Sequence, residues 1–105
     1  MKTQTFYIRI LYNGKDFLKN TTGYLFKDDK RLFIESKNNS IYKQWALVDI
    51  KTGLPLCYGK TKQDLLQKYY DNIKNRYDNY YDSVYYNKAV LKFNELLNNK
   101  ETEEQ

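Results

Sequence analysis

Few side chains in this sequence are of the types that carry out chemistry. The 105 residues include no histidine and a single cysteine, Cys57. Histidine is the commonest general base at neutral pH and the commonest metal ligand, so its absence removes the usual serine and cysteine triads. One cysteine builds neither an internal disulfide nor a zinc site. The sequence therefore predicts a protein without enzymatic activity, and we expect no metal and no cofactor.

The remaining candidates for chemistry have simpler interpretations. Cys57 lies in an apolar segment, where a thiol serves as a small hydrophobic side chain. Asp78 and Asp82 are four residues apart and Asp71 lies two turns earlier, so a helix would carry these carboxylates close together. Lysine, arginine and asparagine residues are interspersed with them, which is typical of a solvated helix face.

The sequence Gly59-Lys60-Thr61 is similar to the end of a phosphate-binding P-loop. That motif needs a glycine at the position that Leu54 occupies. Thr61 is instead followed by Asp64 three residues on, an arrangement typical of a helix N-cap. We interpret Gly59 as the turn between a strand and a helix.

The N-terminal half alternates polar and apolar residues in the manner of β-strands. A strand over 4–12 is followed by Asn13-Gly14, a turn signal because both residues tolerate positive φ. Pro55 cannot donate a backbone hydrogen bond, so the last strand is expected at a sheet edge. The other expected segments are a weak strand or loop over 15–20, a turn over 21–23, a hairpin of 24–27 and 31–35, a loop over 36–40, and strands over 41–50 and 54–58.

Apolar residues after Thr61 recur at helical spacing. They fit either one long bent helix or two helices, the second capped by Asp82-Ser83. Strands followed by helices predict an α+β fold, in which a four- to five-stranded antiparallel sheet carries one or two C-terminal helices on one face. We expect a single domain over residues 1–98 and a frayed acidic tail over 99–105.

The formal charge of +5 is concentrated in residues 1–60, where it amounts to +6. A basic half is a plausible footprint for a polyanion, and solubility is the alternative. The residues expected toward the helices are Phe6, Ile8, Ile10, Tyr24, Phe26, Ala46, Val48 and Ile50. The residues then expected on the outer face are Tyr7, Arg9, Lys27, Arg31, Phe33, Lys43 and Trp45.

Aromatic rings mixed with cations on a sheet suit nucleic acid, because rings stack on bases while cations neutralise phosphates. Two alternatives remain open for this outer face. Phe33 and Trp45 could belong to the core, leaving only the cations exposed, or the whole face could pack on a partner protein.

Seven of the twelve tyrosines lie between Tyr69 and Tyr86. Neighbours on a helix diverge by about 100°, so the adjacent pairs in this segment cannot all point inward. Tyrosine suits interfaces because its large ring has a polar tip. Tyr80, Tyr81 and Tyr85 are therefore candidate binding residues, with a homodimer as one use of this surface. Codon bias with harmless exposure is the alternative.

The sequence predicts a cytoplasmic protein of a bacterial host cell. No apolar run is long enough to span a bilayer, and residues 1–12 alternate in a way that a signal peptide does not. We expect no membrane partner. Lys, Asn, Tyr, Ile and Phe supply 49 of the 105 residues, and all have AT-rich codons, which favours an AT-rich genome such as a low-GC bacterium or its phage.

Two stretches resemble a known class of proteins. The segments 45–54 and 58–66 form a strand–turn–strand–helix pattern with Trp45 and Gly59, and this pattern resembles short accessory proteins of phages and mobile elements, among them anti-CRISPR inhibitors. The resemblance implies a non-enzymatic inhibitor that binds a host nucleoprotein, namely a CRISPR effector nuclease or its guide RNA.

A second resemblance is to the three-stranded arm-binding domains of phage integrases, which lay a sheet in a DNA groove. Strands followed by Gly59-Lys60-Thr61-Lys62 and an amphipathic helix carry it. This chain departs from those domains by its additional N-terminal strand region and second helix. An anti-CRISPR inhibitor is thus the leading hypothesis, and a small DNA- or RNA-binding protein is the alternative.

Overall fold

The chain folds as an antiparallel sheet followed by helices, which confirms the α+β class expected from the sequence. The computed structural model describes the backbone of residues 2–104 and the side chains of residues 2–99. Five strands pair there in chain order, each antiparallel to the next. They are β1 (Gln4–Tyr12), β2 (Lys15–Leu25), β3 (Leu32–Glu35), β4 (Trp45–Asp49) and β5 (Pro55–Gly59).

The helical part of the described chain consists of two helices. The first continues through a π-helical turn, and the second extends along the segment expected to fray, as far as Glu104, while Gln105 lies outside the described residues. None of the described helices combines the length and apolar character that crossing a membrane requires. The elements are α1 (Lys62–Lys68), η1 (Tyr69–Ile73) and α2 (Lys74–Tyr80) in the first helix, and α3 (Val84–Glu104) in the second.

Local signals set where these helices begin. The Thr61 hydroxyl accepts a hydrogen bond from the Asp64 N–H at 3.0 Å, which confirms the predicted N-cap of α1. The chain turns at Asp82, whose φ is +67°. The Ser83 hydroxyl then accepts a hydrogen bond from the Tyr86 N–H at 3.2 Å and caps α3. Two helices, rather than one bent helix, are therefore formed.

The β1–β2 hairpin turns at Asn13-Gly14, as predicted, with φ of +53° and +75°. The turn predicted over 21–23 is wrong, because β2 runs through this segment without a break. The glycine that suggested a turn has another role in β2. A Cβ on Gly23 would lie 2.5 Å from the Ile34 carbonyl oxygen, so only glycine permits β3 to approach β2 this closely. The strand predicted over 41–50 is also shorter than expected, since β4 begins at Trp45.

The sheet curls until its first strand reaches the β4–β5 turn. The Arg9 N–H donates to the Gly53 carbonyl oxygen at 2.9 Å. An inner core fills the curl, and in it the Phe6 ring stacks on Phe33 with 4.1 Å between centroids. The other members of this inner core include Ile8, Ala46 and Val48.

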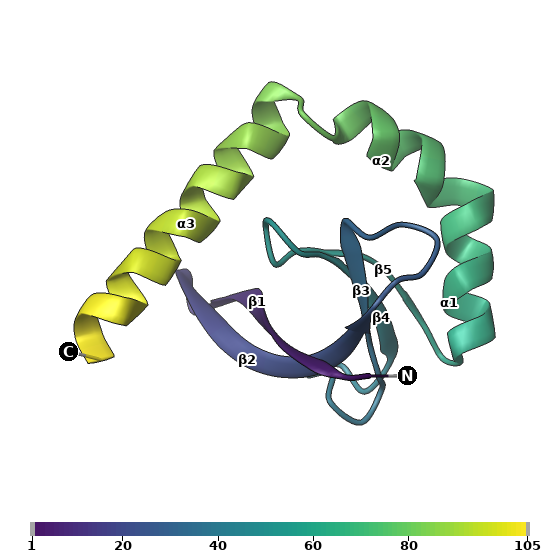
Figure 1. Cartoon of the computed structure of the whole chain (residues 1–105), viewed down its shortest axis with the longest axis horizontal. Coiled ribbons are helices and arrows are strands. Elements are labelled where there is room, and N and C mark those ends of the chain that lie inside the picture. The colour runs from purple at the N-terminus through teal and green to yellow at the C-terminus, as the bar shows by residue number, and fades with distance from the viewer. Residues whose placement is uncertain (1, 105) are drawn as a thin grey trace.

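A second core lies between the sheet and the first helix. Its buried members are Phe26, Leu32, Ile34, Leu47, Leu65, Tyr69 and Tyr77. Figure 1 shows α1 and α2 along one side of the sheet and α3 on the opposite side, near the end of β2 that follows the β1–β2 turn. Phe93 of α3 packs closely here, because a Cβ on Gly53 would lie 2.9 Å from its ring. Both faces of the central strands are therefore covered by protein.

Candidate functional site

The outer sheet face predicted from alternation does not form a single surface. Phe33 was expected on it but is fully buried in the inner core, with 0% of its surface exposed. Trp45 is half-buried and packs against the core beneath the first helix. The prediction that these two rings point to solvent on one face is wrong, because a curled sheet buries both faces of β3 and β4. The alternative that these rings belong to the core is confirmed for Phe33, whereas Trp45 is partly buried and packs against the core.

The cations predicted on that face are dispersed. Arg9 lies on β1 and donates two hydrogen bonds to Asp16 at 3.0 and 3.1 Å. Lys27 is exposed in the β2–β3 turn, and Lys43 is exposed in the loop before β4, with a φ of +57°. Tyr7 is half-buried on β1. These residues therefore do not assemble the mixed aromatic and cationic surface that the alternation predicted.

The tyrosine-rich segment divides between core and surface, as the helical geometry predicted. Tyr86 is buried, whereas its neighbour Tyr85 is 76% exposed and Tyr80 is also exposed. Tyr81 is half-buried, and its ring lies 4.7 Å from the Arg31 guanidinium carbon and 5.4 Å from the Lys51 Nζ. Of the three predicted binding tyrosines, Tyr85 is thus the one most open to a partner.

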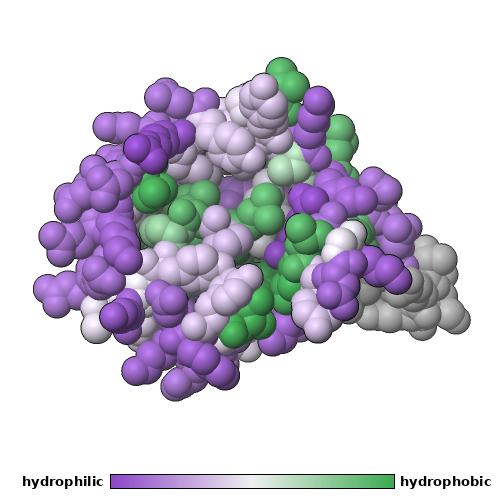
Figure 2. Space-filling view, turned by 180° about the vertical axis from the view of Figure 1, so that it is seen from behind, coloured by the Kyte–Doolittle hydropathy of each residue, from purple (hydrophilic) through white to green (hydrophobic). Residues whose placement is uncertain are grey.

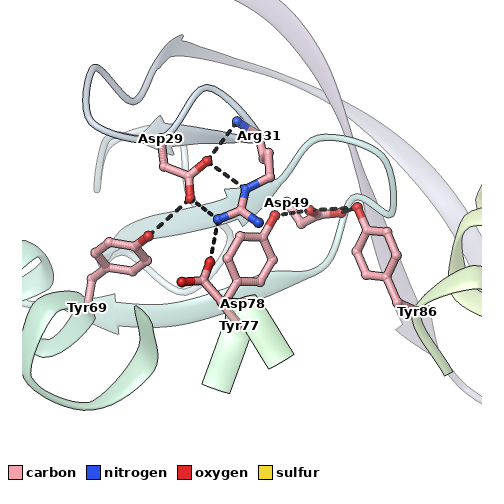
Figure 3. Close-up of polar contacts among 7 residues, drawn as sticks. All are labelled: Asp29, Arg31, Asp49, Tyr69, Tyr77, Asp78 and Tyr86. Atoms are coloured by element: carbon pink, nitrogen blue, oxygen red, sulfur yellow. Dashed lines mark hydrogen bonds and ion pairs between the residues drawn. The ribbon is translucent and has the colours of Figure 1, made fainter. Parts of the chain in front are cut away.

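Asp49 holds the β4–β5 turn and both helices together. Its side chain is buried at the end of β4 and accepts hydrogen bonds from four donor groups. Two come from the Thr52 N–H and hydroxyl, at 2.9 and 2.8 Å. The Tyr77 hydroxyl donates at 2.5 Å and the Tyr86 hydroxyl at 3.0 Å (Figure 3). These donors satisfy the carboxylate, so this cluster has a structural role.

Arg31 forms the centre of a neighbouring cluster between the β2–β3 turn and α2. Its guanidinium donates to Asp29 at 2.8 and 2.5 Å and to Asp78 at 2.8 Å (Figure 3). It also lies 4.4 Å from the centroid of the Tyr77 ring. Burial alone would raise the pKa of Asp29, but the hydrogen bonds from Arg31 outweigh it and hold that pKa below its ordinary value.

The titratable groups of these clusters are poorly suited to proton transfer at neutral pH. Burial, followed by the interaction with Asp49, raises the pKa values of Tyr77 and Tyr86 well above their ordinary range. Burial also raises the pKa of the Cys57 thiol to about 11, so the thiolate nucleophile is scarce at neutral pH. Among the described residues, no three Asp, Glu or Cys side chains are grouped to hold a metal ion.

A depression of about 330 Å³ near Tyr81 is lined partly by cationic side chains, but neighbouring carboxylates offset their positive charge. Arg31, its central cation, is matched by Asp29 and Asp78. Lys51 also lies near Asp82 and Asp49, which contribute to raising its pKa after the Tyr81 hydroxyl does. The residues that line the depression are Lys30, Arg31, Ile50, Lys51 and Tyr81.

A further hollow lies between β1, the loop over 40–42 and β5, and we call it the β1–β5 groove. It contains a pocket of about 120 Å³. Leu11 and Tyr42 stand on its rim with 70% and 59% of their surfaces exposed, and Ile41 lies beside them. The walls and floor include Ile8, Ile10, Glu35, Ala46, Pro55 and Tyr58.

Of the residues that line the groove, sequence reasoning named only Arg9 as a binding residue, and it missed Leu11, Glu35 and Tyr42. Leu11 and Tyr42 were read as parts of alternating strands, and the structure places Tyr42 in a loop. The sequence offered one signal for this site: Glu35 is a charged residue at the end of the apolar run Leu32–Ile34. Figure 2 shows one face of the molecule, on which hydrophobic side chains gather toward the middle, within a margin of hydrophilic ones.

Comparisons with known proteins identified no similar protein. No protein-family model, no curated protein sequence and no solved structure matches the chain.

Proposed function

We propose that this chain is a non-enzymatic binding protein that docks on a protein partner through the β1–β5 groove. The observation that carries the proposal is the rim of the groove, where Leu11 and Tyr42 are largely exposed around an apolar pocket. Exposing such side chains together to water is unfavourable, and exposed apolar patches bordered by polar residues are typical of protein contact sites. Tyrosine is also among the residues that contribute most at interfaces.

The partner proposed here is a host nucleoprotein, and within that class a CRISPR effector nuclease. The resemblance of segments 45–54 and 58–66 to phage accessory inhibitors supports this target. The dispersal of Arg9, Lys27 and Lys43 supports the effector protein, rather than its guide RNA, as the contacted surface. Inhibition by surface complementarity requires no catalytic group of its own, which agrees with a side-chain inventory that lacks histidine.

A cleavage assay tests the function and the site together. Purified type II effectors are programmed with a guide, and target cleavage is measured with increasing amounts of the wild-type chain. We expect inhibition by the wild type and a loss of potency of about tenfold or more in the double variant Leu11→Asp/Tyr42→Asp, because each change places a charge in an apolar contact.

The chain offers a matched control on α3. Leu91 and Tyr85 are 68% and 76% exposed, so Leu91→Asp/Tyr85→Asp makes the same chemical changes at similar exposure away from the groove. This control should inhibit as the wild type does. Unchanged cleavage by every effector tested would refute the inhibitor function, and a loss confined to the α3 variant would move the site to that helix.

Nucleic-acid binding by the wild-type chain is the competing outcome. Binding is measured to the guide RNA alone and to a DNA duplex over a range of salt concentrations. If about four cations contacted phosphates, log K would fall against log salt with a slope of roughly −3 to −4. Such a slope, together with equal binding by the groove variant, would favour the DNA- or RNA-binding alternative.

A further inference from the structure

Glu35 lies at the floor of the β1–β5 groove because of the sheet register. Glu35 pairs with Ala46, and Ala46 pairs with Tyr58, so these three side chains form a row across β3, β4 and β5 on the inner face. The row ends at the pocket, which all three residues line. A carboxyl group is thereby placed among apolar walls, with only 2% of its residue exposed.

The carboxylate of Glu35 has unused capacity for hydrogen bonds. Within the described chain it accepts one, from the Thr21 hydroxyl, and no described cation lies within ion-pairing distance of it. A carboxylate has about four acceptor positions. Asp49, which is equally buried, fills four positions with donors from the chain itself. Glu35 is therefore the buried acidic group that has room for a further donor.

Two tyrosine rings border the same space. Tyr42 and Tyr58 meet edge to face, with 5.3 Å between centroids and 83° between planes. The faces of such rings attract cations. Burial, followed by the proximity of Tyr42 and Glu35, raises the pKa of Tyr58 to about 12, so its hydroxyl is neutral at physiological pH. A positive group entering the pocket would meet a carboxylate and aromatic rings.

We propose that the pocket receives the side chain of a lysine or arginine from the protein partner, an inference that rests on the proposed function and specifies its central contact. The apolar walls accommodate the methylene stem of such a side chain, and Glu35 receives its cationic end. A pocket of about 120 Å³ is of the size that holds a single small hydrophobic group. Arg9, the other charged residue of the lining, is engaged by Asp16.

Other occupants fit less well. An uncharged apolar side chain would seal the carboxylate of Glu35 from water with the Thr21 hydroxyl as its one described donor and no cation beside it, which is unfavourable. An anionic group, such as a phosphate of nucleic acid, would be repelled by the same carboxylate. The acidic floor thus selects a cation although the chain as a whole carries a charge of +5.

A titration of the isolated chain with small probes tests this inference. The probes are the N-acetyl amides of lysine, arginine and norleucine, where norleucine has the lysine stem without the charge. Backbone amide shifts are followed by NMR up to about 20 mM probe, since single side chains bind weakly. We expect saturable shifts centred on Glu35, Tyr42 and Tyr58 for the two cationic probes, and much weaker binding of norleucine.

Two variants and their controls locate the effect. Glu35→Gln keeps the shape of the side chain but removes its charge, and should weaken lysine binding by about tenfold. Glu95→Gln makes the same change in net charge on the exposed surface of α3 and should leave binding unchanged. Tyr42→Leu, at an exposed loop position, should weaken binding severalfold whether or not Glu35→Gln folds, and Tyr85→Leu should have no effect.

Each outcome decides the inference. Equal binding of norleucine and lysine, shifts centred elsewhere, or no shifts at all would overturn it. Free putrescine binding far more tightly than the lysine probe would overturn the assignment to a protein side chain. The cleavage assay distinguishes docking through the groove from binding of a cation in its pocket. If Glu35→Gln inhibits as the wild type does while Leu11→Asp/Tyr42→Asp does not, the proposed docking through the groove stands and the cation-binding pocket is refuted.

Discussion

Asp49 is a charged side chain inside an apolar segment, and the hydrogen bonds from four donor groups explain how the core accommodates it. It receives donors from its own turn and from two helices that lie far away in the sequence. Hydrogen bonds to a charged group are each about twice as strong as neutral ones. Asp49 therefore links the sheet to both helices through one carboxylate.

This arrangement predicts the effect of Asp49→Asn. An asparagine side chain offers an N–H₂ group where the carboxylate accepted hydrogen bonds, so at least one hydroxyl or N–H donor loses its partner in the core. We expect the free energy of unfolding to fall by about 2–4 kcal/mol. Chemical denaturation measures it, and Asp71→Asn, at an exposed position, is the control. A loss below about 0.5 kcal/mol would show that the cluster contributes little.

At this scale the sequence predicted residues whose role depends on their neighbours along the chain. Thr61 as a helix cap and Cys57 as a hydrophobic side chain were both predicted correctly. Phe33 and Trp45 were placed incorrectly, and Glu35 was missed, because their surroundings are made by strands that are distant in sequence. A period-2 pattern gives the face of a strand but not what covers that face.

At the scale of elements, the contact of β1 with the β4–β5 turn closes the curl of the sheet. Gly53 makes this contact feasible. Its φ is +68°, and a Cβ there would lie 2.9 Å from both the Arg9 nitrogen and the Phe93 ring. The glycine therefore supplies a left-handed conformation and also a close approach between β1, the turn and α3.

Gly14 provides a matched reference for separating these two contributions. Its φ is +75°, but a Cβ there would meet nothing within 4 Å. We expect Gly14→Ala to lower the free energy of unfolding by about 1 kcal/mol, the typical cost of the left-handed conformation. Gly53→Ala should cost about 3 kcal/mol or more, because the steric overlap adds to that cost. Equal losses in thermal or urea denaturation would contradict a tight contact at Gly53.

Elements governed by local chemistry could be predicted from the sequence. The Asn13-Gly14 turn and the caps at Thr61 and Ser83 satisfy short-range rules, and the structure confirms all three. The predicted turn over 21–23 failed because Gly23 serves a close approach of β3 instead of a reversal of the chain. A glycine in the sequence does not reveal which of these two needs it meets.

At the scale of the whole molecule, tyrosine hydroxyls connect the helices to the sheet. The Tyr77 and Tyr86 hydroxyls donate to Asp49, and the Tyr69 hydroxyl donates to Asp29 at 3.1 Å. All three rings are buried. Each hydroxyl must keep its proton to donate, and burial, together with the adjacent carboxylate, raises the pKa of each tyrosine. Loss of any of these protons would place two negative charges side by side in the core.

The stability of the whole fold should consequently fall in alkaline solution. The three tyrosines have pKa values near 10 in the unfolded chain and higher ones in the folded chain, so their contribution is complete below about pH 10. Above it the unfolded chain loses protons that the folded chain retains, and stability decreases with rising pH. Each tyrosine contributes about 1.4 kcal/mol per pH unit, or about 4 kcal/mol for the three together.

Urea denaturation at about pH 8, 10 and 11 measures this dependence, with a steep loss expected only between the last two. The double variant Tyr77→Phe/Tyr86→Phe should be less stable at neutral pH, because Asp49 loses two donors, yet its stability should fall with pH less steeply than that of the wild type, because two of the titrating hydroxyls are gone. Tyr85→Phe, at an exposed position, should keep the full slope. An equal slope in the double variant and the wild type would show that the alkaline loss arises outside the Asp49 cluster.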